Sequence, residues 1–170
     1  IMDRAHQWLQ PTRAHWDGIR KQWRFPSGAR LSFGYLATAN DRYRYQGAEF
    51  TFVAFDELTQ FTERDYTYLF SRLRASASFP VPLAMRAATN PGGMGHAWVK
   101  KRFIDEPTSD RTFVPSLMTD NPSLNLDEYR ASLSELDSVT RAQMEHGSWL
   151  DDTTGLMYRV ADSNIHRGAY

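Results

Sequence analysis

The sequence predicts an α/β fold in which a small parallel sheet is flanked by helices. Two apolar segments, residues 50–55 and 83–88, have the composition of buried strands, and each is followed by a segment with helical spacing of apolar residues. Strands that alternate with helices in this way are typical of layered α/β proteins. A chain of 170 residues is long enough to form one domain with its own core.

The composition is that of a soluble globular protein, with 41% hydrophobic and 24% charged residues. Twenty basic residues balance twenty acidic residues, so the net charge points neither to nucleic acid nor to a membrane surface, although a local basic face is compatible with it. The absence of cysteine excludes disulfides and thiolate zinc sites. No apolar run approaches the roughly 18 residues of a membrane span, and no signal peptide is visible.

The sequence of the first part of the chain predicts a helical segment followed by a β-hairpin. Residues 1–21 are expected to be helical, with a break at Pro11 and a second short helix that begins near Thr12. This second helix is favoured by residues at helical spacing, which are His15, Trp16 and Ile19. Segments 23–25 and 31–36 flank Pro, Ser and Gly residues, which indicates two short strands around a turn.

The central part contains the clearest strand. Residues 50–55 form a continuous apolar run, as expected for a parallel strand that is covered on both faces, and the run ends in Asp56 and Glu57. Thr62 and Asp65 resemble a capping box at the start of a helix. The residues that this helix is expected to bury are Tyr66, Leu69, Phe70 and Leu73.

The sequence of the second half of the chain predicts a strand followed by helices. The strand at 83–88 ends in a turn at 89–93, and a helix is expected from His96 to about Ile104. Further segments are a strand at 113–117, with Pro115 indicating a sheet edge, and two helices between Asp127 and Glu145, the second capped by Asp137 or Ser138 and closed near Gly147. Residues 148–170 lose periodicity and are expected to form a linker.

Three local patterns, taken together, resemble one protein family. They are residues 50–61, residues 85–99, and residues 119–124 followed by Tyr129, with supporting matches at 45–47 and 147–149. Their order and spacing resemble the second half of the ATPase domain of a phage large terminase subunit, the motor that packages DNA into capsids. The resemblance covers residues 22 to 158, and its specificity lies in the ordered combination of the patterns.

The resemblance implies a partial P-loop NTPase sheet of the RecA-like, ASCE type, flanked by helices and lacking the Walker A strand, loop and helix. Residues 1–147 would be the C-terminal portion of the ATPase domain, with lid-like helices at about 125–147, and residues 148–170 a linker toward a nuclease domain outside this chain. The sequence contains no G-x-x-x-x-G-K-[ST] motif. The parent protein is therefore expected to use ATP with Mg²⁺, whereas this chain alone is expected neither to bind ATP tightly nor to cut DNA.

The resemblance assigns roles to the two acids after the central strand. Asp56 matches the Walker B aspartate, which helps to hold Mg²⁺ on the nucleotide phosphates, and Glu57 matches the catalytic glutamate, which orients and deprotonates water. Phosphoryl transfer requires mainly positioning and charge neutralisation, which two carboxylates at a strand end can supply. The alternative is a salt-bridged or N-capping pair ahead of the helix that begins at residue 62.

Thr89 and Asn90, at the end of the next strand, match the coupling motif. In that family this motif senses the γ-phosphate and communicates its release to the parts of the motor that grip DNA. The alternative is ordinary turn formation, because Asn-Pro-Gly-Gly is a common turn sequence.

Basic residues are candidates for two further roles, an arginine that acts across a subunit interface and a contact with DNA. Arg44 stands twelve positions before Asp56, near the place where large terminases carry an arginine that acts across the subunit interface. Its competitors are Arg42, Arg72 and Arg74. A basic cluster on a predicted helix is a candidate contact for DNA phosphates, with a solvated helix face as the alternative. The cluster consists of Lys100, Lys101 and Arg102.

The partners that the resemblance implies are double-stranded DNA, the small terminase subunit and the portal of the procapsid, within a ring-forming homo-oligomer and without a membrane. The implied location is the host bacterial cytoplasm, transiently at the procapsid portal. Two alternatives stay open. One is a fragment of a helicase-type P-loop ATPase, and the other is a non-enzymatic prophage remnant that acts as an interaction module.

Overall fold

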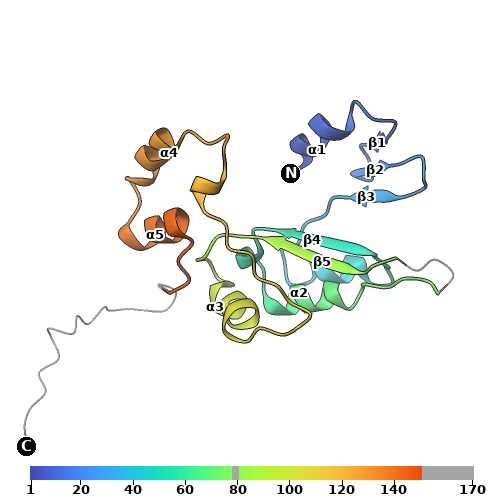
Figure 1. The fold of residues 1–170 in the computed structure, drawn as a ribbon. Helices are drawn as coiled ribbons and strands as arrows, with labels where there is room; N and C mark the ends of the chain where they lie inside the picture. The colour runs from blue at the N-terminus through green and yellow to red at the C-terminus, as the bar shows by residue number, and fades with distance from the viewer. Residues whose placement is uncertain (78–80, 151–170) are drawn as a thin grey trace, which may run out of the picture. The chain divides into compact units, whose positions relative to one another are not determined.

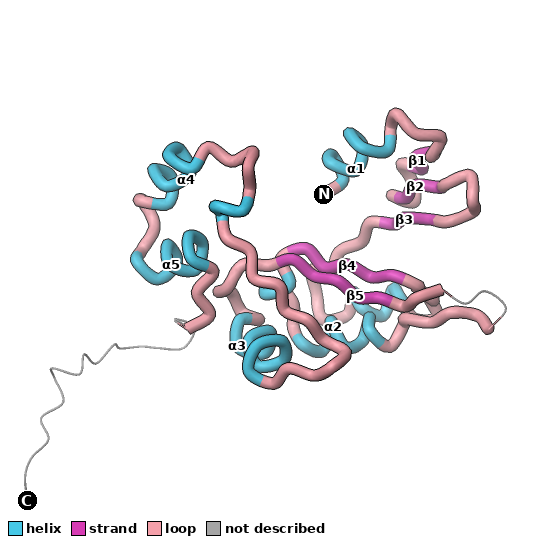
Figure 2. Tube along the Cα trace, viewed as in Figure 1, coloured by secondary structure: helices cyan, strands magenta, loops and turns pink. Residues whose placement is uncertain are grey.

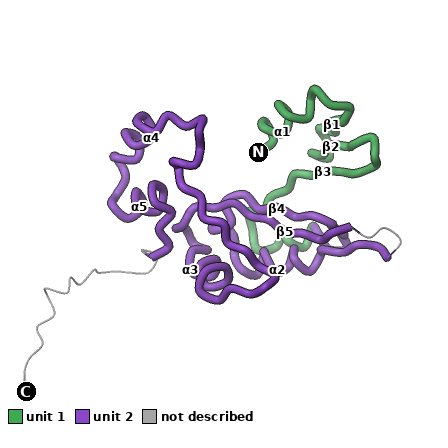
Figure 3. Tube along the Cα trace, viewed as in Figure 1, with its two compact units in different colours: residues 1–44 green, residues 45–170 purple. Residues whose placement is uncertain are grey.

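The structure is a computed structural model and describes residues 1–77 and 81–150. The chain divides into two compact units, Ile1–Arg44 and Tyr45–Tyr170 (Figure 3). In the described residues, α-helices occur together with a three-stranded antiparallel sheet and a two-stranded parallel sheet (Figure 2). The predicted α/β class is therefore confirmed. The assignment of residues 1–147 to one ATPase domain stays a prediction.

The first unit consists of a helix and a small antiparallel sheet. Helix α1 spans Met2–Leu9, and the strands are β1 (His15–Asp17), β2 (Gln22–Arg24) and β3 (Arg30–Ser32), in the order β1-β2-β3. Gly28 has φ +87° in the turn between β2 and β3, a conformation that glycine adopts at little cost. The predicted first helix and hairpin are confirmed.

The predicted second helix near Thr12 is wrong, because His15–Asp17 forms strand β1. Trp16 lies opposite Trp23 in the β1–β2 pair, with ring centroids 5.4 Å apart. The Thr12 hydroxyl donates to the carbonyl of Leu9 at 2.6 Å, so this residue follows the end of α1 and does not cap a new helix. Cross-strand aromatic packing thus decides the conformation over local helical spacing.

The second unit is built around a parallel pair of strands, β4 (Phe52–Asp56) and β5 (Ala84–Ala88) (Figure 1). Their register places Phe52 opposite Ala84 and Asp56 opposite Ala88. An isolated parallel bridge also joins Phe50 to Leu73. Both predicted strands are confirmed, and they end at the same edge of the sheet.

Helix α2, Glu63–Phe70, packs on one face of this pair. Phe55 of β4 lies 5.1 Å from the Phe61 ring and 5.7 Å from the Tyr66 ring, measured between centroids. The helix begins as predicted, because the Thr62 side chain accepts the N–H of Asp65. The predicted burial of Phe70 and of Leu73 within the helix is wrong, because Phe70 is 46% exposed at its last position and Leu73 lies beyond its end.

The expectation that β4 is buried on both faces is also wrong. Phe55 is buried, whereas Phe52 and Ala54, which alternate with it along the strand, are exposed. The aromatic cluster of Phe55, Phe61 and Tyr66 covers one face only. A parallel sheet is ordinarily covered on both faces, so the open side of β4 is an unusual feature.

Helix α3 spans His96–Lys100 and continues as a π-helical turn, Lys101–Asp105, in agreement with the predicted helix at 96–104. The predicted strand at 113–117 is wrong, because these residues have no regular secondary structure. Pro115 cannot donate a backbone hydrogen bond to a sheet, and no strand edge accepts this segment within the described residues.

Two further helices follow, α4 (Leu126–Leu133) and α5 (Ser138–His146). The Asp137 side chain accepts the first free N–H groups of α5, and Gly147 ends the helix with φ +58°. Both predicted helices are confirmed, as are the Asp137 cap and the end near Gly147 that were predicted for the second. Of the predicted linker at 148–170, residues 151–170 lie outside the described residues. Across residues 1–77 and 81–150, none of the helices has the length and apolar character needed to cross a membrane.

Candidate active site

Two strand ends bring the candidate residues to one edge of the sheet. Because β4 and β5 run parallel and Asp56 lies opposite Ala88, Asp56 and Glu57 leave the sheet beside Thr89 and Asn90. Asp56 and Glu57 are both exposed to solvent. This arrangement places two carboxylates next to small polar side chains at the carboxyl end of a parallel pair, where ligands of α/β sheets bind.

Glu57 has a strained backbone. Its φ of 54° and ψ of 57° lie in the left-handed region, which a residue other than glycine rarely occupies. Strain of this kind persists only where the surrounding structure holds it, and it concentrates at functional sites. No pattern in the sequence predicted this conformation.

The short 3₁₀ turn Leu58–Gln60 anchors the backbone directly after Glu57. Leu58 is 1% exposed and Thr59 is 2% exposed, and the N–H of Gln60 donates to the carbonyl of Glu57 at 2.8 Å. Two buried residues therefore follow an exposed carboxylate, and they fix the direction in which the chain leaves β4.

Thr59 connects this turn to the loop after β5. Its hydroxyl oxygen lies 2.9 Å from that of Thr89 and 3.2 Å from the carbonyl oxygen of Asn90. Its backbone N–H donates to the Thr89 hydroxyl oxygen at 3.1 Å. The sequence analysis did not single out Thr59, because nothing local marks a threonine as the partner of a residue thirty positions away.

The glycine-rich part of the same loop lies against the Thr59 turn. The N–H of Gly95 donates to the carbonyl of Thr59 at 2.7 Å. A Cβ atom at Gly95 would stand 2.8 Å from the carbonyl oxygens of both Thr59 and Phe61, so the approach requires glycine. The indole N–H of Trp98 donates to the Phe61 carbonyl at 2.9 Å and adds a second tie.

His96 links this loop to the segment after α5. It is 1% exposed, its Nδ1 accepts the N–H of Gly92 at 2.8 Å, and its ring lies 5.1 Å from the Trp149 ring. A Cβ atom at Gly92 would stand 2.7 Å from Oε1 of Gln143, which is a buried residue of α5. The loop that carries Thr89 and Asn90 is thus packed on both of its sides.

Arg44 belongs to the first compact unit, at its boundary with the second. Its guanidinium pairs with Asp41 at 3.0 Å and donates to the Tyr35 hydroxyl at 2.7 Å, while also lying over the Tyr35 ring. The backbone N–H of Thr38 lowers the pKa of Asp41, with Arg44 contributing in the same direction. These contacts hold Arg44 against its own unit.

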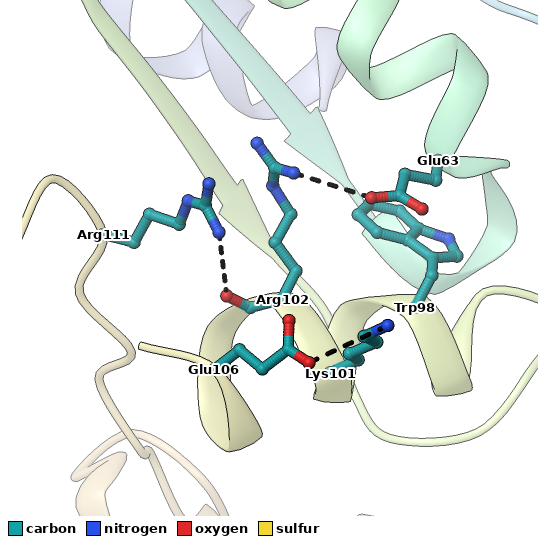
Figure 4. Close-up of a pocket in the computed structure, with 6 residues that line it drawn as sticks. All are labelled: Glu63, Trp98, Lys101, Arg102, Glu106 and Arg111. Carbon is teal, nitrogen blue, oxygen red and sulfur yellow. Dashed lines mark hydrogen bonds and ion pairs between the residues drawn. The ribbon is translucent and has the colours of Figure 1, made fainter. Parts of the chain in front are cut away.

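The predicted basic cluster is divided between two pockets of the second unit. Lys101 and Arg102 line a pocket of about 180 Å³ that also contains Trp98 and Arg111 (Figure 4). Lys100 lines a separate pocket of about 240 Å³ beside His96 and Trp149.

Each cation of the cluster has a carboxylate within 4 Å. The distances are 3.2 Å from Lys100 to Asp105, 3.8 Å from Lys101 to Glu106 and 3.5 Å from Arg102 to Glu63, of which the last two are drawn in Figure 4. The local field is therefore weaker than the sequence alone indicates. The role of this cluster in nucleic-acid binding stays a prediction.

The acidic residues at the strand end bear carboxylates, which are ligands that Mg²⁺ takes in nucleotide sites. Within residues 1–77 and 81–150, no group of three or more His, Cys, Asp or Glu residues could hold a metal ion. Mg²⁺ in nucleotide sites commonly takes only one or two carboxylates and completes its shell with phosphates and water. An exposed Asp56 at the strand end meets that requirement, so the donor set is compatible with Mg²⁺ carried by a phosphate ligand.

Comparison with known proteins identifies the family. Neither a curated protein nor a solved structure matches the chain. A family model described as terminase large subunit, T4likevirus-type, N-terminal, matches residues 5–165, which is nearly the whole chain. On that match, the chain belongs to the family of T4likevirus-type terminase large subunits, in their N-terminal region.

Proposed function

We propose that the chain is the C-terminal portion of the ATPase domain of a terminase large subunit, which drives the packaging of phage DNA into procapsids. In this proposal β4 is the Walker B strand, the loop after β5 carries the coupling motif, and α4 and α5 are lid-like helices. The strands β4 and β5 belong to a partial P-loop NTPase sheet. The family match over residues 5–165 and the parallel pairing of the two strands support it.

The roles proposed for the site residues are supported by their placement. Asp56 would hold Mg²⁺, and Glu57 would orient and deprotonate the attacking water. Mg²⁺-ATP, when bound, supplies the γ-phosphoryl group. Thr89 and Asn90, which leave the neighbouring strand at the same edge, would sense a phosphate held there. Positioned carboxylates and small donors are what phosphoryl transfer asks of a protein.

The observation that carries this proposal is the register of the sheet. Asp56 lies opposite Ala88, so the acidic pair and the Thr89–Asn90 pair emerge side by side. Glu57 also has a left-handed backbone conformation, which is uncommon for a residue other than glycine.

The phosphate-binding loop is proposed to come from another part of the protein, because the sequence contains no Walker A motif. The 170-residue chain alone should then bind ATP only weakly. A thermal-shift measurement of this chain with Mg²⁺-ATP tests this point, and a clear stabilisation at low-micromolar ATP would contradict it.

The remaining assignments concern the assembled motor. We propose that Lys100, Lys101 and Arg102 contact DNA phosphates, and that Arg44 acts across the interface between subunits of a ring. The proposed partners are double-stranded DNA, the small terminase subunit and the procapsid portal, in the host bacterial cytoplasm. Because the cations of the cluster are paired with carboxylates, DNA would have to displace those carboxylates on binding.

The decisive experiment is Glu57→Gln in the full-length large subunit. The variant keeps the size and polarity of the side chain and removes the base, so ATP hydrolysis should fall by about 10²–10⁴-fold while nucleotide binding is retained. Glu49→Gln is the matched control, because Glu49 is an exposed residue whose contact with Arg74 spans 3.7 Å. Hydrolysis that survives in Glu57→Gln at the level of Glu49→Gln would refute the role of Glu57.

A further inference from the structure

We infer that Thr59 is a positioning residue, which locks the Thr89–Asn90 loop to the turn that carries Glu57 so that the two strand ends move as one unit. The inference rests on the proposed function, since it concerns the same site. It adds a buried residue that stands in neither signature pair. Its argument depends on the hydrogen bonds, burial and strain around this residue.

Several hydrogen bonds join Thr59 to Thr89 and Asn90. The Thr59 N–H donates to the Thr89 hydroxyl oxygen, and each of the two hydroxyl groups has one proton to give. The Thr89 hydroxyl has two acceptors within reach, the Thr59 hydroxyl oxygen at 2.9 Å and the carbonyl oxygen of Asn90 at 3.0 Å. Whichever of them it takes, the two hydroxyl groups stay bonded to each other and one of them donates to the Asn90 carbonyl. Three short contacts from one buried residue define the position of both Thr89 and Asn90.

Burial makes these bonds costly to lose. Thr59 is 2% exposed, so a backbone or hydroxyl group that loses its partner there has little access to water. The carbonyl of Thr59 is also used, because it accepts the N–H of Gly95 at 2.7 Å. The residue therefore connects to the loop after β5 at two places, at Thr89–Asn90 and at Gly95.

The strain at Glu57 gives this connection a consequence for the site. Glu57 stands two positions before Thr59 and has φ 54°, a conformation of raised energy for a residue other than glycine. The Thr59 contacts hold that turn. A change in the position of Thr89 or Asn90 is thereby transmitted to the backbone of Glu57 through the Thr59 side chain and the two peptide bonds between Thr59 and Glu57.

Packing alone would not need the hydroxyl. Valine has the shape of threonine, and a merely structural Thr59 would tolerate Thr59→Val at the cost of its hydrogen bonds while leaving the kinetics of the site unchanged. If Thr59 has a positioning role, kcat should fall in Thr59→Val, which loses the hydroxyl, and should be largely kept in Thr59→Ser, which retains it. Thr67→Val is the control, because Thr67 is exposed on α2 and its hydroxyl bonds only to carbonyls of its own helix.

The first measurement uses the 170-residue chain. Amide hydrogen exchange of Gly95 should quicken by about tenfold or more in Thr59→Val and in Thr89→Val, with a less than additive increase in the double variant, since both remove the contact between the two hydroxyl groups. Thr67→Val should leave this amide unchanged. Additive effects of the two substitutions on Gly95 exchange would overturn the inference, as would a Gly95 amide that is unaffected in both single variants.

The second measurement uses ATP hydrolysis by the full-length large subunit. Thr59→Val should lower kcat by about 10- to 100-fold with little change in KM for ATP, because nucleotide binding persists while Glu57 is misplaced, and Thr59→Ser should restore most of the rate. If Thr59→Val does not fold, Thr59→Ala and Thr59→Ser, which differ only in the hydroxyl group, give the same comparison. A kcat for Thr59→Val equal to that of Thr67→Val would refute the positioning role.

The two proposals fail differently. If Glu57→Gln retains hydrolysis, the proposed active site is wrong, whatever the Thr59 variants do. If Glu57→Gln abolishes hydrolysis while Thr59→Val hydrolyses normally, the active site stands and the positioning role of Thr59 is wrong.

Discussion

The hydroxyl oxygens of Thr59 and Thr89 lie 2.9 Å apart, although thirty positions separate the two residues in the chain. Thr59 lies in the turn after β4 and Thr89 in the loop after β5, so this contact joins the two segments at the carboxyl edge of the strand pair. The carboxylates of Asp56 and Glu57 consequently stand on a turn whose inner side is fixed and whose outer side faces solvent. Such a rigid support beneath exposed acids is what a site for phosphoryl transfer requires.

Glu57→Gly is expected to increase the free energy of unfolding of the 170-residue chain by about 0.5–1 kcal/mol, because glycine adopts a positive φ without steric cost. The control is Glu49→Gly, at an exposed position where φ is not positive. That change should decrease stability by about 0.5–1 kcal/mol through the entropy of the unfolded chain. Denaturant titrations of both variants provide the measurement, and a loss of stability of equal size in both would show that Glu57 is unstrained.

Gly95→Ala is expected to destabilise the chain by about 1–3 kcal/mol, because the new methyl group would stand 2.8 Å from two backbone carbonyl oxygens that cannot move independently. Gly18→Ala is the control, since the nearest atom to its Cβ is Nε1 of Trp16 at 3.5 Å, an ordinary contact. Urea unfolding followed by circular dichroism measures both. Equal midpoints for the two variants would contradict the close approach of the Gly95 loop to the Thr59 turn.

Strands β2 to β5 and most helices could be predicted from the sequence because their signals are local, whereas the segment that forms β1 was predicted to be helical. The apolar run at 50–55 identifies β4, and Thr62, Asp137 and Gly147 mark helix ends whose capping bonds involve neighbouring residues only. The placement of Asp56 beside the end of β5 could also be anticipated, since parallel strands share an edge.

The errors have a common physical cause, which is that distant partners decide the outcome. The spacing of Trp16 and Ile19 fits a helix, yet Trp16 packs on Trp23 across two strands and Ile19 is 95% exposed. The hydrogen bonds of Thr59 depend on a loop thirty residues away, and the left-handed backbone of Glu57 depends on how that turn is anchored. None of these relationships has a signature within a short window of sequence.

Acidification is expected to weaken the cap of α5. The hydroxyl of Thr140, followed by its backbone N–H, lowers the pKa of the Asp137 carboxyl below the ordinary value of 3.8. Since the folded protein favours the charged carboxylate, this stabilisation is fully present above pH 3.8 and is lost as the pH falls through the lower, folded-state value.

Denaturant midpoints measured as a function of pH test this expectation. Asp137→Asn keeps a good capping residue without a titrating group, so its stability should decline less steeply below pH 3.8 than that of the unsubstituted chain. Thr140→Val removes the strongest cause of the pKa shift and should also flatten the decline. Three identical pH profiles would show that the cap does not contribute to acid sensitivity.

The two faces of β4 should respond differently to truncation. Phe55 is 6% exposed and contacts Phe61 and Tyr66, so Phe55→Ala should destabilise the chain by about 3–5 kcal/mol. Phe52 lies on the opposite face of the same strand and is 52% exposed, so Phe52→Ala should cost less than about 1 kcal/mol. Thermal or urea unfolding of the two variants, which differ only in the face that is truncated, measures the asymmetry directly. Equal losses would mean that both faces are covered in solution, and a greater cost for Phe52→Ala in the full-length large subunit than in this chain would show that another segment packs on the open face.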